Sequence, residues 1–361
     1  MIKSISINRF KGFLNFEVQG LSRVTLIGGQ NSIGKTSLLE AVFLFFGRNL
    51  ADVFIRLLSW RGVPGVSLLG DDMVAPFFMD YDASREMEIG LKFDTGMERL
   101  RLSFDSAGRS KVLRDQHPRR GNGVSYMPTD HRVAAGFAVE MKYKSPHKSD
   151  GTAHLLAGTE TPIEILPGPG FSEERHCIFL QTCRSIDPAE DALHWGDLDR
   201  VGKAECAVEF LKEFFPSLRG LSLIPLAGGQ PIIYADVGLA RKTPAGCVGD
   251  GFSRLLSIFL AIASCENGVV LVDEIGGGLY YSAQAKVWRG VEEAARHYNC
   301  QVIATTHSYE IIKAANEGLQ GSLVEPEFSY VRLEKGDKGI EAKTYPFSVL
   351  GAALERGWEV R

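Results

Sequence analysis

The sequence predicts an α/β fold in which helices flank a mixed central sheet and a β-rich region is inserted. Apolar runs at 24–27, 268–272 and 301–304 have the length of buried strands, and each is followed by a turn and a helix start. Between the first and second runs, alternating apolar residues predict antiparallel strands. A chain of 361 residues has room for one large α/β domain with an insertion, or for two domains.

The first apolar run leads directly into a glycine-rich loop. Gly29–Thr36 fits the pattern G-x-x-x-x-G-K-[ST] without departure. Glycines let the backbone N–H groups turn towards phosphate oxygens, and the following helix adds its positive dipole end. Lys35 should reach the β- and γ-phosphates of ATP, and the Thr36 hydroxyl should bind Mg²⁺. The predicted nucleotide-binding residues here are Gly29, Gln30, Asn31, Ser32, Ile33, Gly34, Lys35, Thr36 and Ser37.

The rest of the N-terminal half is read mainly as strands. Ile2–Ile7 alternates like a half-buried strand, and the apolar residues up to Val18 continue it as a hairpin. Residues 49–76 are apolar but aperiodic, so no element is assigned to them. A hairpin is expected at 87–104, a further strand at 137–143, and loop structure at 145–169.

The C-terminal half alternates strands and helices. A strand is expected at Cys177–Leu180, one helix at Pro188–Phe215 and a hairpin at Leu221–Val237. A glycine-containing turn at Val248–Arg254 precedes an apolar helix. Further helices are expected at 282–297 and 309–316, and the tail should form two strands and a last helix up to Glu355.

Polar residues stand where the predicted buried strands end. Asp273 and Glu274 follow one strand, and His307 follows the next. A buried carboxylate pair is costly unless a cation meets it, so we expect Asp273 to hold Mg²⁺ and Glu274 to act as the general base. We expect His307 to contact the γ-phosphate, because ligands gather at this edge of an open α/β sheet. Gln181 is either a bridge between Mg²⁺ and the attacking water or simply a strand-end amide.

Composition excludes several classes of protein. A net charge of −4 gives no general attraction to nucleic acid, and the basic stretch Arg109–Arg120 is read as a solvated loop before it is read as a DNA contact. The six cysteines are scattered, which indicates a reduced, cytoplasmic setting instead of a disulfide framework or a zinc site. No membrane span and no secretory leader are expected.

The order of these motifs resembles that of the ABC-type P-loop ATPases. The opening IKSISINRFKGFLNFEV with GQNSIGKTSLLEAV is typical of the SMC/RecF-like and OLD-like branch. The stretches GDGFSRLL, VDEIGGGLYYS and ATTHSYE are similar to small prokaryotic AAA_15 and AAA_21 ATPases, which occur in anti-phage systems beside a nuclease or toxin. The resemblance implies an ATPase domain in two halves, 1–48 with Walker A and 172–361 with signature, Walker B and H-loop, around the inserted region 49–171.

The resemblance also implies a dimer in which the signature of one copy contacts the ATP of the other. The signature positions that would act in trans are Gly249, Asp250, Gly251 and Phe252, where the family has Leu-Ser-Gly-Gly-Gln. The family's serine hydroxyl is missing, so backbone N–H groups and the helix dipole would take its place. Gly277–Leu279 likewise replaces the usual Ala-Leu-Asp, and no coiled coil separates the two halves.

The leading functional prediction is an ATP-hydrolysing homodimer or higher homo-oligomer that regulates a separate effector protein in anti-phage defence. The alternative is a recombination or repair ATPase of the SMC/RecF type that binds DNA. A transporter subunit is disfavoured by the variant signature, and a scaffold with little turnover is disfavoured by Glu274 and His307.

Overall fold

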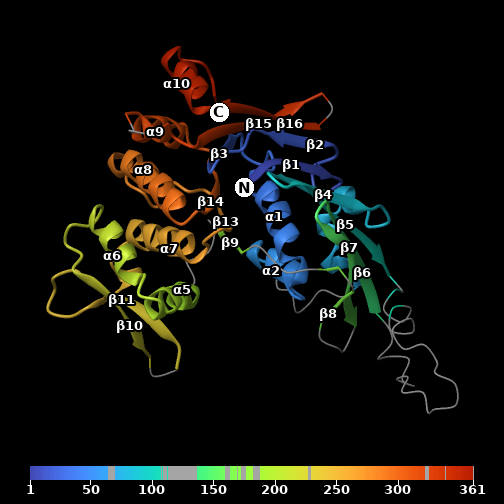
Figure 1. The fold of residues 1–361 in the computed structure, drawn as a ribbon, viewed down its shortest axis with the longest axis horizontal. Coiled ribbons are helices and arrows are strands. Elements are labelled where there is room, and N and C mark those ends of the chain that lie inside the picture. The colour runs from blue at the N-terminus through green and yellow to red at the C-terminus, as the bar shows by residue number, and fades with distance from the viewer. Residues whose placement is uncertain are drawn as a thin grey trace.

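The structure is a computed structural model, and it contains two large sheets with the helix that follows the glycine loop between them (Figure 1). It describes residues 1–63, 70–106, 108, 112, 136–158, 163–168, 170–171, 176–181, 188–226, 229–321, 325–337 and 339–360. The basic stretch at 109–120 lies outside these residues, apart from Val112.

A six-stranded mixed sheet forms the centre of the fold, in the order β16-β15-β3-β14-β13-β9. Five strands run parallel and β16 pairs antiparallel at one edge. Strands β3, β13 and β14 are buried along their whole length, because helices cover both faces of the sheet. The bounds are β3 Val24–Gly29, β9 Cys177–Leu180, β13 Val269–Val272, β14 Gln301–Thr305, β15 Phe328–Gly336 and β16 Gly339–Pro346.

A seven-stranded antiparallel sheet lies on the other side of α1, in the order β2-β1-β4-β5-β6-β7-β8. Its strand β1 comes from the extreme N-terminus and pairs with β4 from the inserted region. The boundaries at 48 and 171 stay a prediction, and this pairing crosses the first of them. The bounds are β1 Ile2–Asn8, β2 Phe16–Gln19, β4 Met87–Phe93, β5 Gly96–Asp105, β6 Gly136–Ser145, β7 Lys148–Gly158 and β8 Glu164–Pro167.

Two hydrophobic cores hold these layers together. The first fills the space between the sheets around α1, in which 10 of 12 residues are buried. The second lies on the opposite face of the six-stranded sheet, under the helices that follow the signature. The helices are α1 Lys35–Phe46, α2 Val53–Trp60, α5 Pro188–Arg200, α6 Ala204–Lys212, α7 Asp250–Ser264, α8 Tyr281–His297, α9 Tyr309–Leu319 and α10 Phe347–Glu355.

A small third sheet packs beside α5, in the order β10-β11-β12. Its strands are β10 Gly220–Pro225, β11 Pro231–Asp236 and β12 Thr243–Pro244, and the first two form the predicted hairpin. Short 3₁₀ turns lie at 47–49, 70–73, 75–77, 79–81 and 245–247. Among the described residues, no helix combines the length and apolar character that a membrane span needs.

Two sequence predictions are wrong. The segment 145–169 was expected to be loop, but it contains β7 and β8. Ala153, Leu155 and Ala157 alternate along β7 and are buried, but two of these side chains are small, so the apolar pattern is weak. The strand is defined mainly by its hydrogen-bonded pairing with β6. The single helix expected at 188–215 is two helices, which are separated by a turn at Val201–Lys203.

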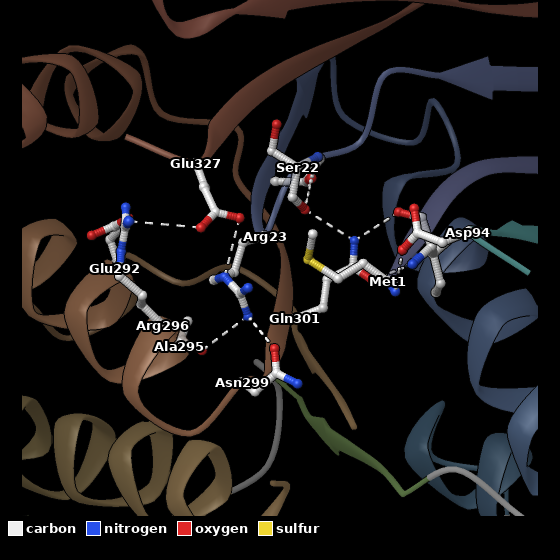
Figure 2. A network of polar contacts seen from close by, with 12 residues as sticks. Met1, Ser22, Arg23, Asp94, Glu292, Ala295, Arg296, Asn299, Gln301 and Glu327 are labelled. Carbon is white, nitrogen blue, oxygen red and sulfur yellow. Dashed lines mark hydrogen bonds and ion pairs between the residues drawn. The ribbon is translucent and has the colours of Figure 1, made fainter. Parts of the chain in front are cut away.

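The side chain of Gln301 links the two sheets at the amino end of β14 (Figure 2). Its Oε1 accepts from the backbone N–H of Ile2 at 2.7 Å, and its amide donates to the carbonyls of Ile2 and Ser22 at 2.9 Å each. Beside it, Arg23 pairs with Glu327 at 3.2 Å. Both polar atoms of the Gln301 side chain are hydrogen-bonded. These bonds join the two sheets at the edge opposite the strand ends that carry the predicted site.

Candidate functional site

The glycine loop after β3 has the backbone that its sequence predicts. Gly29 and Gly34 have φ values of 137° and 102°, which favour glycine. A Cβ at Gly29 would lie 2.5 Å from the carbonyl oxygen of Leu333, and Gly34 is the N-cap of α1. Gln30, Asn31 and Ser32 face solvent, while Ile33 and Ser37 are partly buried. The loop is therefore open on the side where a phosphate would enter.

Lys35 lies inside this loop. Its side chain is buried, and Nζ donates to the carbonyls of Gly29 at 2.9 Å and Gln30 at 3.0 Å. Burial lowers the pKa of Lys35, and the nearby charges of Glu274 and Asp273 act in the opposite direction. An ammonium that bonds two loop carbonyls at the N-terminal end of α1 is well placed to turn to an incoming anion.

Thr36 meets Asp273 at the end of β13. The Thr36 hydroxyl is 3.0 Å from both carboxylate oxygens of Asp273. On its other side, Asp273 accepts a hydrogen bond of 2.6 Å from the hydroxyl of Thr305, which is fully buried at the end of β14. Hydroxyl and carboxylate oxygens are the ligands that Mg²⁺ prefers, so this set of donors fits that ion.

Glu274 and His307 form the outer part of the site. His307 Nδ1 lies 2.9 Å from Glu274 Oε2, and the His307 backbone N–H donates to the same oxygen at 3.2 Å. Glu274 has φ 49°, a left-handed backbone that costs a non-glycine residue about 1 kcal/mol or more. Its backbone N–H donates to the Thr305 hydroxyl at 2.9 Å, which holds this conformation.

Comparisons with known proteins find similar ATP-hydrolysing proteins. A family model described as "AAA domain, putative AbiEii toxin, Type IV TA system" matches residues 171–313. A Helicobacter pylori protein named "ATP/GTP phosphatase" is 20% identical, and the match covers 96% of this chain and 95% of that one. An uncharacterised Methanocaldococcus jannaschii protein, MJECL11, is 30% identical over 21% of this chain and 72% of its own length.

Heads of SMC proteins are among the solved structures that are similar to this chain. An SMC head bound to the C-winged helix domain of ScpA aligns over 98% of this chain and 99% of that one, with a TM-score of 0.52 and 13% identity. A second SMC head, bound to the C-terminal domain of ScpA derived from Pyrococcus furiosus, gives a TM-score of 0.51 and 12% identity. The chain is a P-loop ATPase that shares its fold with the SMC heads. It therefore has the fold that the motif order predicts.

The sequence reasoning missed Arg254 as a site residue of the ATPase. Arg254 extends from α7 and is buried, and its guanidinium donates to the carbonyls of Gln181 at 2.9 Å and Asp273 at 2.6 Å, with a longer contact to Glu274 at 3.4 Å. Its Nε has no hydrogen-bond partner among the residues that the structure describes. Burial lowers the pKa of Arg254, against the charges of Asp273 and Glu274. The only signal in the sequence is a lone arginine at the start of an apolar helix.

Thr305 was also missed, although it stands at a strand end beside His307. Its buried position and two contacts make it the centre of a hydrogen-bonded chain that joins Asp273 to Glu274. For Gln181, the described hydrogen bond belongs to its backbone carbonyl and not to its amide. The predicted role of that amide therefore stays a prediction.

The signature residues of the ATPase form the first turn of α7. Gly249 is the exposed N-cap, with φ 149°, and Asp250 is exposed as well. Gly251 packs closely on the turn after β13, where a Cβ would lie 2.9 Å from the carbonyl oxygen of Gly278. Phe252 differs from the other predicted signature residues, because its ring is 1% exposed and contacts the ring of Phe215 in the core. Only its backbone is left to contact a partner.

Proposed function

We propose that the ATPase binds MgATP through its loop at 29–37, closes around ATP as a symmetric dimer, and regulates a separate effector protein in prokaryotic anti-phage defence. One observation carries the nucleotide part of this proposal. A continuous chain of hydrogen bonds runs from Thr36 through Asp273 and Thr305 to Glu274 and His307. It places a hydroxyl, two carboxylates and an imidazole at one edge of the sheet, next to the glycine loop.

The roles follow from the contacts. Thr36 and Asp273 would hold Mg²⁺, with Gln181 as the third predicted ligand. The ion, when bound, neutralises phosphate charge and polarises the phosphate oxygens. Lys35 would move from its two loop carbonyls to the β- and γ-phosphates.

Glu274 would take the proton of the attacking water. His307 orients Glu274 through its Nδ1 and backbone N–H, and its other ring nitrogen would contact the γ-phosphate. The "ATP/GTP phosphatase" name of the Helicobacter pylori relative supports hydrolysis.

The proposed dimer and the proposed effector are supported by two different observations. The first turn of α7 presents Gly249 and Asp250 to solvent, so its N–H groups are accessible to a second copy. The description of the matching family names a toxin of a toxin–antitoxin system, which is a two-component arrangement. This supports a partner protein and a setting in defence.

The test is Glu274→Gln, which should keep ATP affinity and slow hydrolysis by roughly 10²-fold or more, the scale of a lost general base. Because ATP is then not consumed, light scattering should show a dimer with ATP and Mg²⁺ and a smaller mass without them. Lys35→Ala is the control and should stay in its nucleotide-free state. A parental hydrolysis rate in Glu274→Gln, or turnover by a strictly monomeric protein, would contradict the proposal.

The effector part needs its own experiment. The native protein should co-purify with the product of an adjacent gene, and the purified chain should hydrolyse ATP without cutting DNA or RNA. Salt-dependent binding of duplex DNA by the isolated chain would favour the recombination and repair alternative. Metal-dependent cleavage of nucleic acid that persists in Lys35→Ala would place the destructive chemistry in this chain.

A further inference from the structure

A groove of about 900 Å³ lies between α6, α7 and α8. Figure 1 shows these three helices together on the side of the molecule away from the seven-stranded sheet. The groove uses Phe259 and Ala263 of α7 and the last turn of α8, so it lies roughly 15 Å along α7 from the signature turn. It is therefore separate from the nucleotide site, although α7 takes part in both.

The floor of the groove is apolar. The rings of Phe210 and Phe259 pack with centroids 4.1 Å apart, and Ala263, Ala294 and Tyr298 complete the surface. Phe210 is only partly buried, so part of its ring remains available at the groove. Such a floor suits an apolar side chain of a partner, because its burial would remove both surfaces from water.

The rim of the groove is acidic. One side of α6 carries acidic residues at every fourth position, Glu205, Glu209 and the C-cap residue Glu213. Glu293 of α8 also lines the groove. Glu209 pairs with Lys212 at 2.6 Å, while the other three carboxylates form no ion pair within the described part of the chain. Like charges at i, i+4 destabilise a helix, so this stripe is not explained by the stability of α6.

The electrostatics of Glu293 support the same conclusion. Burial raises its pKa, and the charge of Glu213 adds to that effect, whereas Arg289 opposes it. Glu213 and Glu293 are both exposed, and a cation bound between them would relieve their mutual repulsion. The groove thus combines an apolar floor with a rim in which four carboxylates outnumber the basic side chains of Lys212 and His297.

We propose that this groove is a docking site for a basic amphipathic segment of a partner protein, with apolar residues on Phe210 and Phe259 and Lys or Arg residues facing the α6 stripe. The stripe spans about 12 Å, which matches two turns of a helix with cations at every third or fourth position. A second copy of this chain is a poor occupant, because it carries a net charge of −4. The inference goes beyond the proposed function, since it does not depend on ATP hydrolysis or dimerisation.

The probe is a fluorescein-labelled 18-residue peptide of Lys and Leu with helical spacing, compared with a peptide in which Glu replaces Lys. Fluorescence anisotropy at physiological salt should show binding of the Lys peptide only. The variant Glu205→Gln/Glu209→Gln/Glu213→Gln should bind it at least tenfold more weakly. The affinity of the parent should also fall as salt is raised, because the rim charges are exposed to screening.

A matched variant controls for net charge. Glu17→Gln/Glu317→Gln/Glu341→Gln removes the same three charges at exposed positions outside the groove and should change affinity less than twofold. A second groove variant, Cys206→Trp, removes no charge but places a ring at an exposed position that lines the groove. It should also weaken binding at least tenfold, with an unchanged thermal midpoint.

The outcomes separate clearly. A loss of peptide affinity in both groove variants, but not in the control variant, supports the docking site. If both triple variants lose peptide affinity equally, the peptide is attracted by net charge alone. If Cys206→Trp binds the peptide as the parent does, the peptide binds elsewhere. Either result overturns the proposal. If the groove variants instead abolish self-association of the parent protein while the peptide does not bind, the occupant is a second copy and the proposal is wrong.

Discussion

Replacing Thr305 by valine should damage both stability and metal use, because its hydroxyl serves two neighbours at once. Valine keeps the shape but cannot donate to Asp273 or accept from the Glu274 backbone N–H. A hydrogen bond to a charged group contributes about 1.5–3 kcal/mol, and a buried N–H left unpaired costs about 1–3 kcal/mol. We therefore expect the free energy of unfolding to fall by about 3–5 kcal/mol.

The same change should raise the Mg²⁺ concentration needed for half-maximal hydrolysis. Groups that orient a metal ligand typically account for about 10–100-fold in metal affinity, and Thr305 orients Asp273. Urea unfolding without nucleotide gives the stability, and ATP turnover against Mg²⁺ at fixed ATP gives the metal requirement. Thr305→Ser keeps the hydroxyl, so its free energy of unfolding and its Mg²⁺ requirement should both lie close to those of the parent.

The neighbouring residue provides a matched control. Thr306 is equally buried, but its hydroxyl accepts from the backbone N–H of Ser308 at 3.1 Å, and the structure describes no bond from it to Asp273. Thr306→Val should cost about 1 kcal/mol and leave the Mg²⁺ requirement unchanged. If Thr305→Val and Thr306→Val shift both quantities equally, the hydrogen-bonded chain does not organise the site.

Three further predictions concern other parts of the molecule. Lys35→Ala should abolish binding of labelled ATP in the presence of Mg²⁺, whereas Lys313→Ala, an exposed control on α9, should bind normally. Arg254→Met should lower the free energy of unfolding by about 3 kcal/mol in urea and reduce turnover, because two short bonds to strand-end carbonyls are lost; an unchanged turnover would refute its positioning role. Burial raises the pKa of Tyr143 to about 12, with a contribution from its bond to Glu98. The folded state thus keeps this proton above pH 10, and the stability advantage of the parent over Tyr143→Phe should shrink by about 2 kcal/mol between pH 10 and pH 12. A difference that stays constant over this range would contradict the prediction.

The strands that carry the site could be predicted because they are short, continuously apolar and followed by polar residues. Val269–Val272 and Gln301–Thr305 are buried on both faces, so their patterns needed no knowledge of their neighbours. The glycine loop was equally local, since its backbone and its chemistry both follow from Gly29–Thr36. The fold class and the grouping of the site at one sheet edge therefore followed from sequence.

What escaped prediction depends on contacts between distant segments. The strand at Lys148–Gly158 carries few large apolar residues, so only its pairing with β6 reveals it. The pairing of β1 with β4 joins residues 80 or more positions apart and makes the inserted strands part of the same sheet as the N-terminus. The contacts of Arg254 with two strand ends are likewise set by the packing of α7, which no spacing rule describes.

The first turn of α7 is fixed to the ATPase's own site at two places, and this affects how a trans contact can be tested. Arg254 holds the strand-end carbonyl of Asp273, and Gly251 lies against the carbonyl of Gly278 in the turn after Glu274. A bulky residue at Gly251 would therefore displace the chain's own turn before it reached a phosphate bound by a second copy. Gly249, which has open space around it, lacks that contact. Because both contacts are made to backbone carbonyls, a force on this turn from a second copy would act on the backbone that carries Asp273 and Glu274. Such a force would give a dimer a physical route for coupling its two sites.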